Sequence, residues 1–506
     1  MVTTGQADTR ARSPESLWRH RNFMLLWTGQ TVSETGSAVT TVALPLIAVA
    51  VLKASAFEVG LLAAATYFAF SLIALPAGVV VDRLAKRKIM MWCDGARLLI
   101  VGTIPMFAAL HILALWQLFA VALITGVFTV FFDVSYQSYV PSIVDGPQLI
   151  DGFGKLGASA SFAQVSGRGT AAGLVAVIGA AEALIVDALS YAVSFVCLLS
   201  IRGRESGSDS SKRSIGQLKA DIVSGIPFLW NHPVLRKTTA YAAIGNLFIA
   251  MQISLNILFL IRVLNVRPSL AALLTALSSL GGIIGGMSSR PITRRVGSAR
   301  IMWFSALILD APSLVLPLAE PGFLVILFVI GYAASSFAFS IFGAAQLSYR
   351  QSVCPPEKRG KMNAASRWVT WGILPFGGLL GGALGSGIGI RNSEWIAFAG
   401  AWLAGFFLFF SPLRRVRDIG DLATDLPRSR AHGAAVSYRG RAVARRWGPM
   451  PRSSGTRSKA RAASRMAARS TGSSHRVSRS ASRKAGPSTL TRSATASPAS
   501  RSSARS

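Results

Sequence analysis

The chain has 506 residues, 51% hydrophobic and only 15% charged, and its mean hydropathy is +0.46. A soluble domain carries about 25% charged residues, so this composition excludes an ordinary soluble protein and indicates a membrane protein. The net charge of +32 is unevenly placed, because residues 427–506 hold 17 Arg, 2 Lys and no acid.

Twelve apolar stretches of about 20 residues are long enough to cross a hydrocarbon core of about 30 Å as helices. We predict spans at 23–51, 57–81, 89–110, 115–139, 154–178, 182–201, 238–261, 269–289, 301–319, 322–348, 363–388 and 394–411. The predicted domains are a disordered N-terminus (1–16), a six-helix bundle (17–201), a cytoplasmic linker (202–237), a second six-helix bundle (238–415) and a disordered basic tail (416–506). The first twenty residues have no apolar core, so we expect no signal peptide.

Basic residues predict the orientation, because cytoplasmic loops are enriched in Lys and Arg. One set of connections holds 19 bases and the opposite set holds four. We therefore expect a multi-pass protein of the cell membrane with both termini in the cytoplasm.

The two halves resemble each other. "SYVPSIV" (138–144) and "SYRQSVC" (348–354) end the fourth span of each half, and "RKIMMW" and "ARIMWF" open the third. The sequence thus predicts an all-α membrane protein with twelve transmembrane helices in two parallel six-helix repeats, which is the plan of a secondary transporter whose site lies between the halves.

A dense charge cluster, "GVVVDRLAKRK", follows the second span. It resembles the loop signature of the major facilitator superfamily: Gly78, Asp82, Arg83 and Arg87 match, whereas Ala85 replaces a glycine. "FFDVSYQSYVPSIV", "DALSYAVSF" and "RGKMNAASRWVTWGILPFGGLLGGALG" are similar to the branch of enterobactin exporters, macrolide-efflux proteins and transmembrane secretion effectors. The resemblance implies the major facilitator fold, transport by alternating access and a cavity lined by spans one, four, seven and ten.

The same resemblance implies a conformational latch. In the family, the loop aspartate contacts the start of span eleven and stabilises the outward-facing state, which assigns this role to Asp82 with Gly78, Arg83 and Arg87. The alternative is a loop whose charges only fix topology. Asp94 and Arg97 lie one turn apart in span three, and we expect them to extend the charge network of Asp82 and Arg83.

Intramembrane ionisable residues are costly and are functional candidates. Glu34 lies about 16 Å along span one at 1.5 Å per residue, and Arg168 lies at a similar depth in span five. Glu34 is the candidate coupling or substrate carboxylate, with Arg168 as its ion-pair partner or as a contact for an anionic group. The alternative for both is a structural pair or a watery vestibule.

Span seven carries three amides, Asn246, Gln252 and Asn256. They could hydrogen-bond a substrate, or equally join helices at about 0.6–2 kcal/mol each. Aspartates 187 and 310 are isolated acids for which we favour a structural role.

No nucleotide-binding, metal or catalytic motif stands out, so we expect no enzyme activity, no cofactor and an ion gradient as the energy source. The predicted function is proton-coupled export of small amphipathic molecules by a monomer in contact with membrane lipids. The alternatives are a siderophore, lipid or other metabolite transporter of the same fold, or a non-transporting sensor or scaffold.

The basic tail has three interpretations: lipid binding, non-specific nucleic-acid binding or a shifted reading frame. We favour the last or a dispensable tail, and expect no specific nucleic-acid partner.

Overall fold

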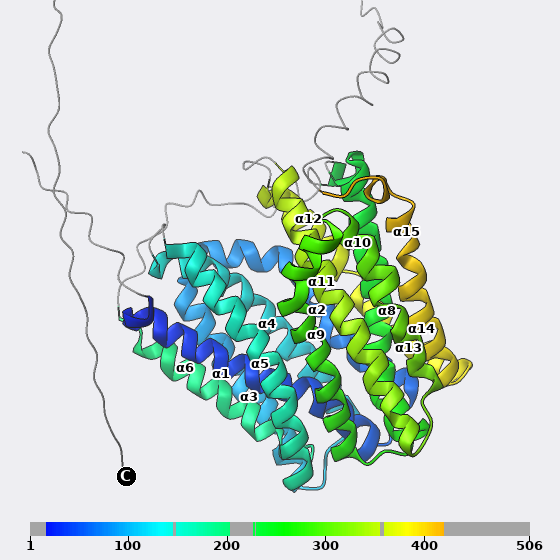
Figure 1. The fold of residues 1–506 in the computed structure, drawn as a ribbon. Helices are drawn as coiled ribbons and strands as arrows, with labels where there is room; N and C mark the ends of the chain where they lie inside the picture. The colour runs from blue at the N-terminus through cyan, green and yellow to red at the C-terminus, as the bar shows by residue number, and fades with distance from the viewer. Residues whose placement is uncertain (1–16, 145–147, 203–225, 228, 355–358, 419–506) are drawn as a thin grey trace, which may run out of the picture. The chain divides into compact units, whose positions relative to one another are not determined.

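The computed structural model describes residues 17–144, 148–202, 226–227, 229–354 and 359–418 (Figure 1). The predicted disordered ends and most of the linker lie outside these residues. The first half contains η1 (Leu17–Arg19), α1 (Arg21–Leu46), η2 (Ile47–Val51), α2 (Ala56–Arg83), α3 (Lys86–Ala109), α4 (Leu115–Ile143), α5 (Leu149–Val177) and α6 (Leu184–Ser200). The second contains α8 (Pro233–Leu258), η4 (Phe259–Val263), α9 (Pro268–Val296), α10 (Arg300–Phe304), η5 (Ser305–Leu309), η6 (Ala311–Leu318), η7 (Phe323–Val325), α11 (Ile326–Val353), α12 (Arg359–Trp371), α13 (Leu374–Gly387), α14 (Ile390–Ala404), α15 (Phe406–Phe409) and η9 (Pro412–Arg414).

All twelve predicted spans coincide with helical segments of the structure. Within the described residues, nine helices are long and apolar enough to cross a membrane. The other three predicted spans correspond to α5, to the 17-residue α6 and to the pair α14–α15. The prediction of an all-helical membrane protein is confirmed.

Span eleven is divided into α12 and α13, and proline explains the division. Pro375 stands at the start of α13, where it has no N–H to donate and its ring would clash with the carbonyl four residues earlier. Gly372 lies in the gap, and its N–H bonds to the carbonyl of Trp368. The second part of the span can therefore follow its own direction.

The two halves repeat each other in local geometry. Span one ends in the π-helical turn η2, followed by Lys53 with a φ of 52°; span seven ends in η4, followed by Asn265 with a φ of 51°. In both spans, the backbone N–H of the residue after this left-handed position donates to the carbonyl of the residue six positions earlier. These bonds run from Ala54 to Ala48 and from Val266 to Leu260. The internal repeat seen in the sequence is thus a repeat of structure.

The helix packing repeats as well. In the first half α1 packs on α5 and α6, and α4 packs on α2 and α3. In the second half α8 packs on α13 and α14, and α11 packs on α9 and α10, which are the equivalent pairs. Each half is a bundle, and the two bundles meet where α2 packs on α13 and α5 packs on α9. The predicted parallel repeats are confirmed.

Two membrane faces can be told apart. We call the face carrying the α2–α3 and α9–α10 connections, residues 84–85 and 297–299, the basic face, because Arg83, Arg295 and Arg300 flank these turns. The other side, where α1 ends and α2 begins, is the opposite face. The bundles are joined there, and a continuous apolar core lines both sides of that contact, including Leu46, Ile47, Leu258 and Phe259.

Candidate functional site

The two bundles come closest near the opposite face, where glycines bring α2 and α13 into backbone contact. A Cβ added to Gly60 would lie 2.6 Å from the carbonyl oxygen of Gly378 and 2.6 Å from the Cα of Gly382. Only glycine permits such an approach. Arg262 strengthens the same closure, because its guanidinium donates across to the carbonyl of Ala54 at 2.5 Å.

A cavity of about 420 Å³ lies on the basic-face side of this closure, between α5 of the first bundle and α8, α9 and α11 of the second. Its polar lining consists of Ser161, Gln164, Arg168, Gln252, Ser279, Tyr332, Ser335, Ser336 and Ser340. Ile249, Ile253, Ile283 and Phe339 supply apolar walls. The cavity offers hydrogen-bonding groups, one permanent positive charge and apolar surface, so it suits a small amphipathic molecule.

Arg168 supplies that positive charge. Its guanidinium donates to the hydroxyl of Ser279 at 2.9 Å, which joins α5 to α9 across the two bundles. Glu34 does not pair with it: the Glu34 carboxylate accepts a 2.7 Å bond from Gln30, one turn earlier on α1. Within the described residues Glu34 and Arg168 form no ion pair, so that alternative is wrong. The other alternative, in which Arg168 contacts an anionic group, stays a prediction.

Glu34 belongs instead to a polar group between α1 and α4. The half-buried Glu34 lies within electrostatic range of Asp133, and both lie within such range of Tyr136. Asp133 also feels the charge of Arg97, on α3 of its own bundle, and that of Arg367, on α12 of the second bundle. Arg367 itself stacks over Phe70 of α2 at 5.1 Å, so this cation stands at the boundary between the bundles.

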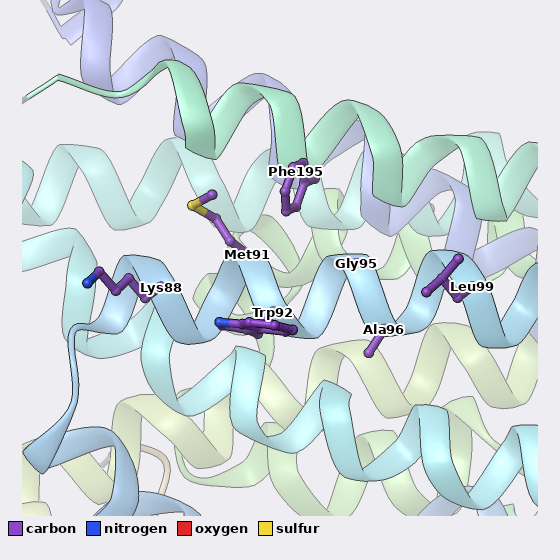
Figure 2. A pocket seen from close by; sticks show the side chains of 7 residues that line it. All are labelled: Lys88, Met91, Trp92, Gly95, Ala96, Leu99 and Phe195. Atoms are coloured by element: carbon purple, nitrogen blue, oxygen red, sulfur yellow. The ribbon is translucent and has the colours of Figure 1, made fainter.

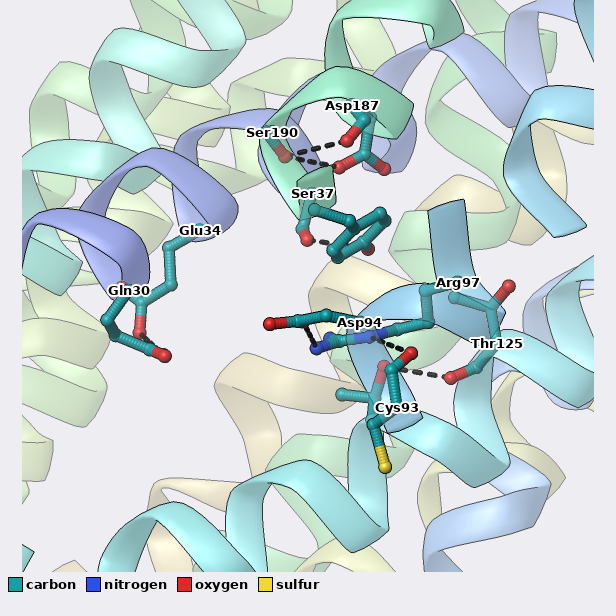
Figure 3. A network of polar contacts seen from close by, with 11 residues as sticks. Gln30, Glu34, Ser37, Cys93, Asp94, Arg97, Thr125, Asp187 and Ser190 are labelled. Atoms are coloured by element: carbon teal, nitrogen blue, oxygen red, sulfur yellow. Dashed lines mark hydrogen bonds and ion pairs between the residues drawn. The ribbon is translucent and has the colours of Figure 1, made fainter. Parts of the chain in front are cut away.

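Asp94 and Arg97 form a buried ion pair of 2.5 Å in the interior of the first bundle (Figure 3). The Arg97 guanidinium lies between the rings of Phe132 and Tyr191, at 4.5 and 4.4 Å. Asp187 lies nearby in Figure 3 and accepts bonds from Thr40 and Ser190. The pair fastens α3 to α4 and α6. The expectation that it also extends the network of Asp82 and Arg83 stays a prediction, because the Asp82 side chain lies outside the described residues.

The loop cluster is described only in part. Gly78 and Asp82 lie in the last turns of α2, Arg83 ends that helix with an exposed side chain, and the Asp82 side chain lies outside the described residues. Arg87 donates to the carbonyls of Leu198 and Leu199 at 2.7 and 2.8 Å. A cation at these last carbonyls of α6 is favourable because it compensates the helix dipole.

The three amides of α8 differ in environment. Asn246 donates to the carbonyl of Thr370 on α12 at 2.7 Å, which supports the helix-joining alternative. Gln252 lines the cavity and also reaches the carbonyl of Ala397 on α14 at 3.4 Å. Asn256 is buried, and its side-chain oxygen has no hydrogen-bond partner among the described residues.

A second hollow of about 500 Å³ lies between α3 and α6, away from the inter-bundle cavity (Figure 2). Its walls are apolar, with Lys88 at one end; they consist of Met91, Trp92, Gly95, Ala96, Leu99 and Phe195. Trp92 and Leu99 are 77% and 72% exposed. In a membrane such a face meets lipid tails, so we do not include it in the candidate site.

Sequence reasoning missed several residues that the structure brings to the cavity or behind it. Ser279 and Tyr332 line the cavity, but serines and tyrosines in apolar helices give no distinctive signal. Glu394 is wholly buried in α14. The predicted twelfth span began at this residue, whereas α14 begins at Ile390. The sequence therefore placed the Glu394 carboxyl at the end of the span, although it lies inside the helix.

Comparison with known proteins agrees with this architecture. The family model of the Major Facilitator Superfamily matches residues 26–376. The multidrug efflux pump Tap of Mycolicibacterium fortuitum is 22% identical over 393 residues, which are 76% of this chain and 94% of that protein.

Two solved structures show the same fold at low identity. A mutant of the nucleoside transporter NupG aligns with a TM-score of 0.65 at 12% identity, over 77% of this chain and 99% of that one. A bacterial homologue of the lysosomal transporter Spinster, in an inward-facing and occupied conformation, aligns with a TM-score of 0.61 at 17% identity, over 78% and 97%.

Proposed function

Because the chain belongs to the Major Facilitator Superfamily, and is thus a transporter rather than an enzyme, we propose that it exports small amphipathic molecules in exchange for protons. The mixed lining of the inter-bundle cavity is the observation that carries this proposal. The likeness to a multidrug efflux pump supports export and drug-like cargo.

Alternating access follows from where the bundles touch. The contacts of Gly60 with Gly378 and Gly382, and of Arg262 with Ala54, hold the bundles together near the opposite face. The excess of basic residues favours a cytoplasmic location for the basic face, in the cell membrane with both termini inside. In that orientation the closure is extracellular and the molecule is in an inward-facing state, ready to take cargo from the cytoplasm.

Glu34 is our candidate for proton coupling. It is half-buried in a helix that crosses the membrane, and a second carboxyl, Asp133, lies within its electrostatic range. Two carboxyls in one low-dielectric site do not readily both ionise, so protonation of the pair can respond to a nearby cation. Arg367 is such a cation and belongs to the other bundle. A change in the distance between the bundles would therefore change how strongly this pair holds its proton.

For Gly78, Asp82, Arg83 and Arg87 we retain the latch as a proposal. A carboxylate at a helix N-terminus is favourable by about 0.3–1 kcal/mol, which can bias two conformations without locking either. The bonds of Arg87 to the end of α6 support an additional part in holding the first bundle together.

Arg168 favours a second class of cargo. The Arg168 guanidinium is partly buried, and among the described residues its side chain bonds one hydroxyl, that of Ser279. It therefore has capacity for a carboxylate or phosphate, which a guanidinium binds in bidentate fashion. This supports the alternative of an anionic metabolite or siderophore. The scaffold alternative depends on the tail, residues 427–506, and transport that survives removal of the tail would count against it.

The test measures accumulation of a cationic dye, a neutral macrolide and an anionic siderophore in cells that lack their main exporters. We expect the protein to lower the intracellular level of at least one compound, and a protonophore to restore it. Lowering that persists with the protonophore would contradict proton coupling, and no change for any compound would contradict export of these three classes.

A further inference from the structure

Glu394 differs from the other buried acids of the chain. Its side chain is fully buried in α14, and neither carboxyl oxygen has a hydrogen-bond partner among the described residues. Asp94, by contrast, is paired with Arg97, and Asp187 accepts bonds from Thr40 and Ser190. Glu394 is an isolated carboxyl inside the second bundle.

The charged groups around α14 are engaged elsewhere. Arg391, on the same helix, donates to the carbonyl of Ala319 at 2.8 Å, and Arg262 of η4 donates to Ala54 of the first bundle. Asp310, just before η6, is buried as well, and one of its two carboxyl oxygens has no hydrogen-bond partner among the described residues. Among the described residues, no Lys or Arg side chain hydrogen-bonds to either carboxyl oxygen of Glu394.

An isolated ionised carboxylate in an apolar interior is so costly that the group neutralises instead. We therefore expect Glu394 to be neutral in this conformation. A glutamine or leucine would fill the position without that requirement, so a carboxyl here is explained best by a role in which it gains and loses the proton.

A polar connection leads from Glu394 to the inter-bundle cavity. Tyr332 lies within electrostatic range of Glu394 and within hydrogen-bonding reach of Asn256. Tyr332 also lines the cavity, and the side-chain oxygen of Asn256 is buried without a partner. Tyr332 and Asn256 are thus two polar side chains between the carboxyl and the cavity between the bundles.

We propose that Glu394 is a second proton-binding site, in the second bundle. It takes its proton from outside when the cavity opens at the opposite face, still holds it in the inward-facing state described here, and releases it to the cytoplasm by way of Asn256 and Tyr332 as cargo enters the cavity. It acts beside Glu34, and its part in transport rests on the proposed proton-coupled function. The carrier then moves two protons rather than one in each cycle.

The first experiment tests the proton itself and needs no substrate. Infrared spectra of the purified full-length protein are recorded from pH 5 to pH 9, for wild type, Glu394→Gln and Glu320→Gln. Glu320 is an exposed acid between η6 and η7, so its variant is the matched control. We expect a carbonyl band of a protonated carboxylic acid that persists to high pH in wild type and in the control, and that is lost in Glu394→Gln. A spectrum at pH 9 that is identical in wild type and Glu394→Gln would overturn the proposal.

The second experiment tests coupling in proteoliposomes with the membrane potential clamped at zero and ethidium as the probe. For each proton exchanged per ethidium, a pH difference of one unit changes the equilibrium ratio of ethidium concentrations across the membrane by about tenfold. We expect Glu394→Gln to accumulate about tenfold less ethidium than wild type or Glu320→Gln, while exchange of ethidium without a pH gradient is unchanged.

The outcomes separate the two claims. Equal accumulation by wild type and Glu394→Gln, with wild type driven by the pH gradient, would overturn the role of Glu394 and leave the proposed function intact. If wild type exchanges ethidium but its ethidium accumulation does not depend on the pH gradient, the proposed proton coupling is wrong, and so is the role of Glu394. If ethidium is not exchanged at all, the infrared result alone decides whether Glu394 holds the proton.

Discussion

Replacing Gly60 by alanine should hold the two bundles apart at the opposite face. The added Cβ would lie 2.6 Å from the carbonyl oxygen of Gly378 and 2.8 Å from the backbone nitrogen of Gly382. These are backbone atoms of α13, so no side chain can rotate away. The helices must separate for the methyl group to fit.

The size of the effect follows from the nature of the contact. Overpacking a close contact costs about 1–3 kcal/mol, and a bias of that size changes a two-state equilibrium by about 5- to 150-fold. Within α2 alone, alanine is about 1 kcal/mol more favourable than glycine. We therefore expect Gly60→Ala to leave the bundles folded and to shift the population toward a state that is open at the opposite face.

Distances between spin labels measure this shift. Labels at Val51→Cys, at the end of η2, and Asn392→Cys, in α14, report the separation of the two bundles once the native cysteines have been replaced. Gly387→Ala is the matched control on α13, because a Cβ there meets no other atom within 4 Å. We expect a longer-distance population in Gly60→Ala and the wild-type distribution in Gly387→Ala. Identical distributions in all three proteins would refute the closure by α2 and α13.

Three further predictions concern the ion pair, the cavity and the tail. Asp94→Asn leaves Arg97 as an unpaired buried charge, and should lower the free energy of unfolding by about 3–5 kcal/mol, measured as a lower melting temperature in detergent; an unchanged melting temperature would contradict burial of the pair. Arg168→Gln removes the cavity's charge and, since hydrogen bonds to charged groups contribute about 1.5–3 kcal/mol, should weaken binding of an anionic compound at least tenfold while binding of a neutral one changes little, as measured by competition. Removal of residues 427–506 should leave the transport rate unchanged in proteoliposomes, and loss of transport would favour the scaffold alternative.

The fold could be predicted because its signals are local. Long apolar runs give the spans, and loop charge predicts the faces. The repeated Ser-Tyr motif marks Tyr139 and Tyr349, which are both buried near the ends of equivalent helices, α4 and α11. In the stretch "GGLLGGALG" (377–385), small residues four positions apart allow a close approach of helices, and the structure places Gly378 and Gly382 against α2.

The site was less predictable because it depends on which helices face each other. Glu34 and Arg168 lie at similar depths, but one bonds along its own helix and the other reaches across to Ser279. Hydropathy indicates how deep in the membrane a residue lies but not which neighbouring helix its side chain faces. It therefore cannot predict the bonding partners of Glu34 and Arg168. Glu394 was missed for a related reason, since the predicted span began one turn too late.

The most direct test of the account is the response of reconstituted protein to an imposed pH gradient, using a compound that the protein exports from cells. Wild type should accumulate the compound against its gradient, and a protonophore should abolish this accumulation. Glu34→Gln should retain exchange of the compound but lose the response to the pH gradient. If Glu34→Gln responds to the gradient as wild type does, Glu34 is not the coupling carboxylate; if wild type itself does not respond, proton-coupled export is wrong.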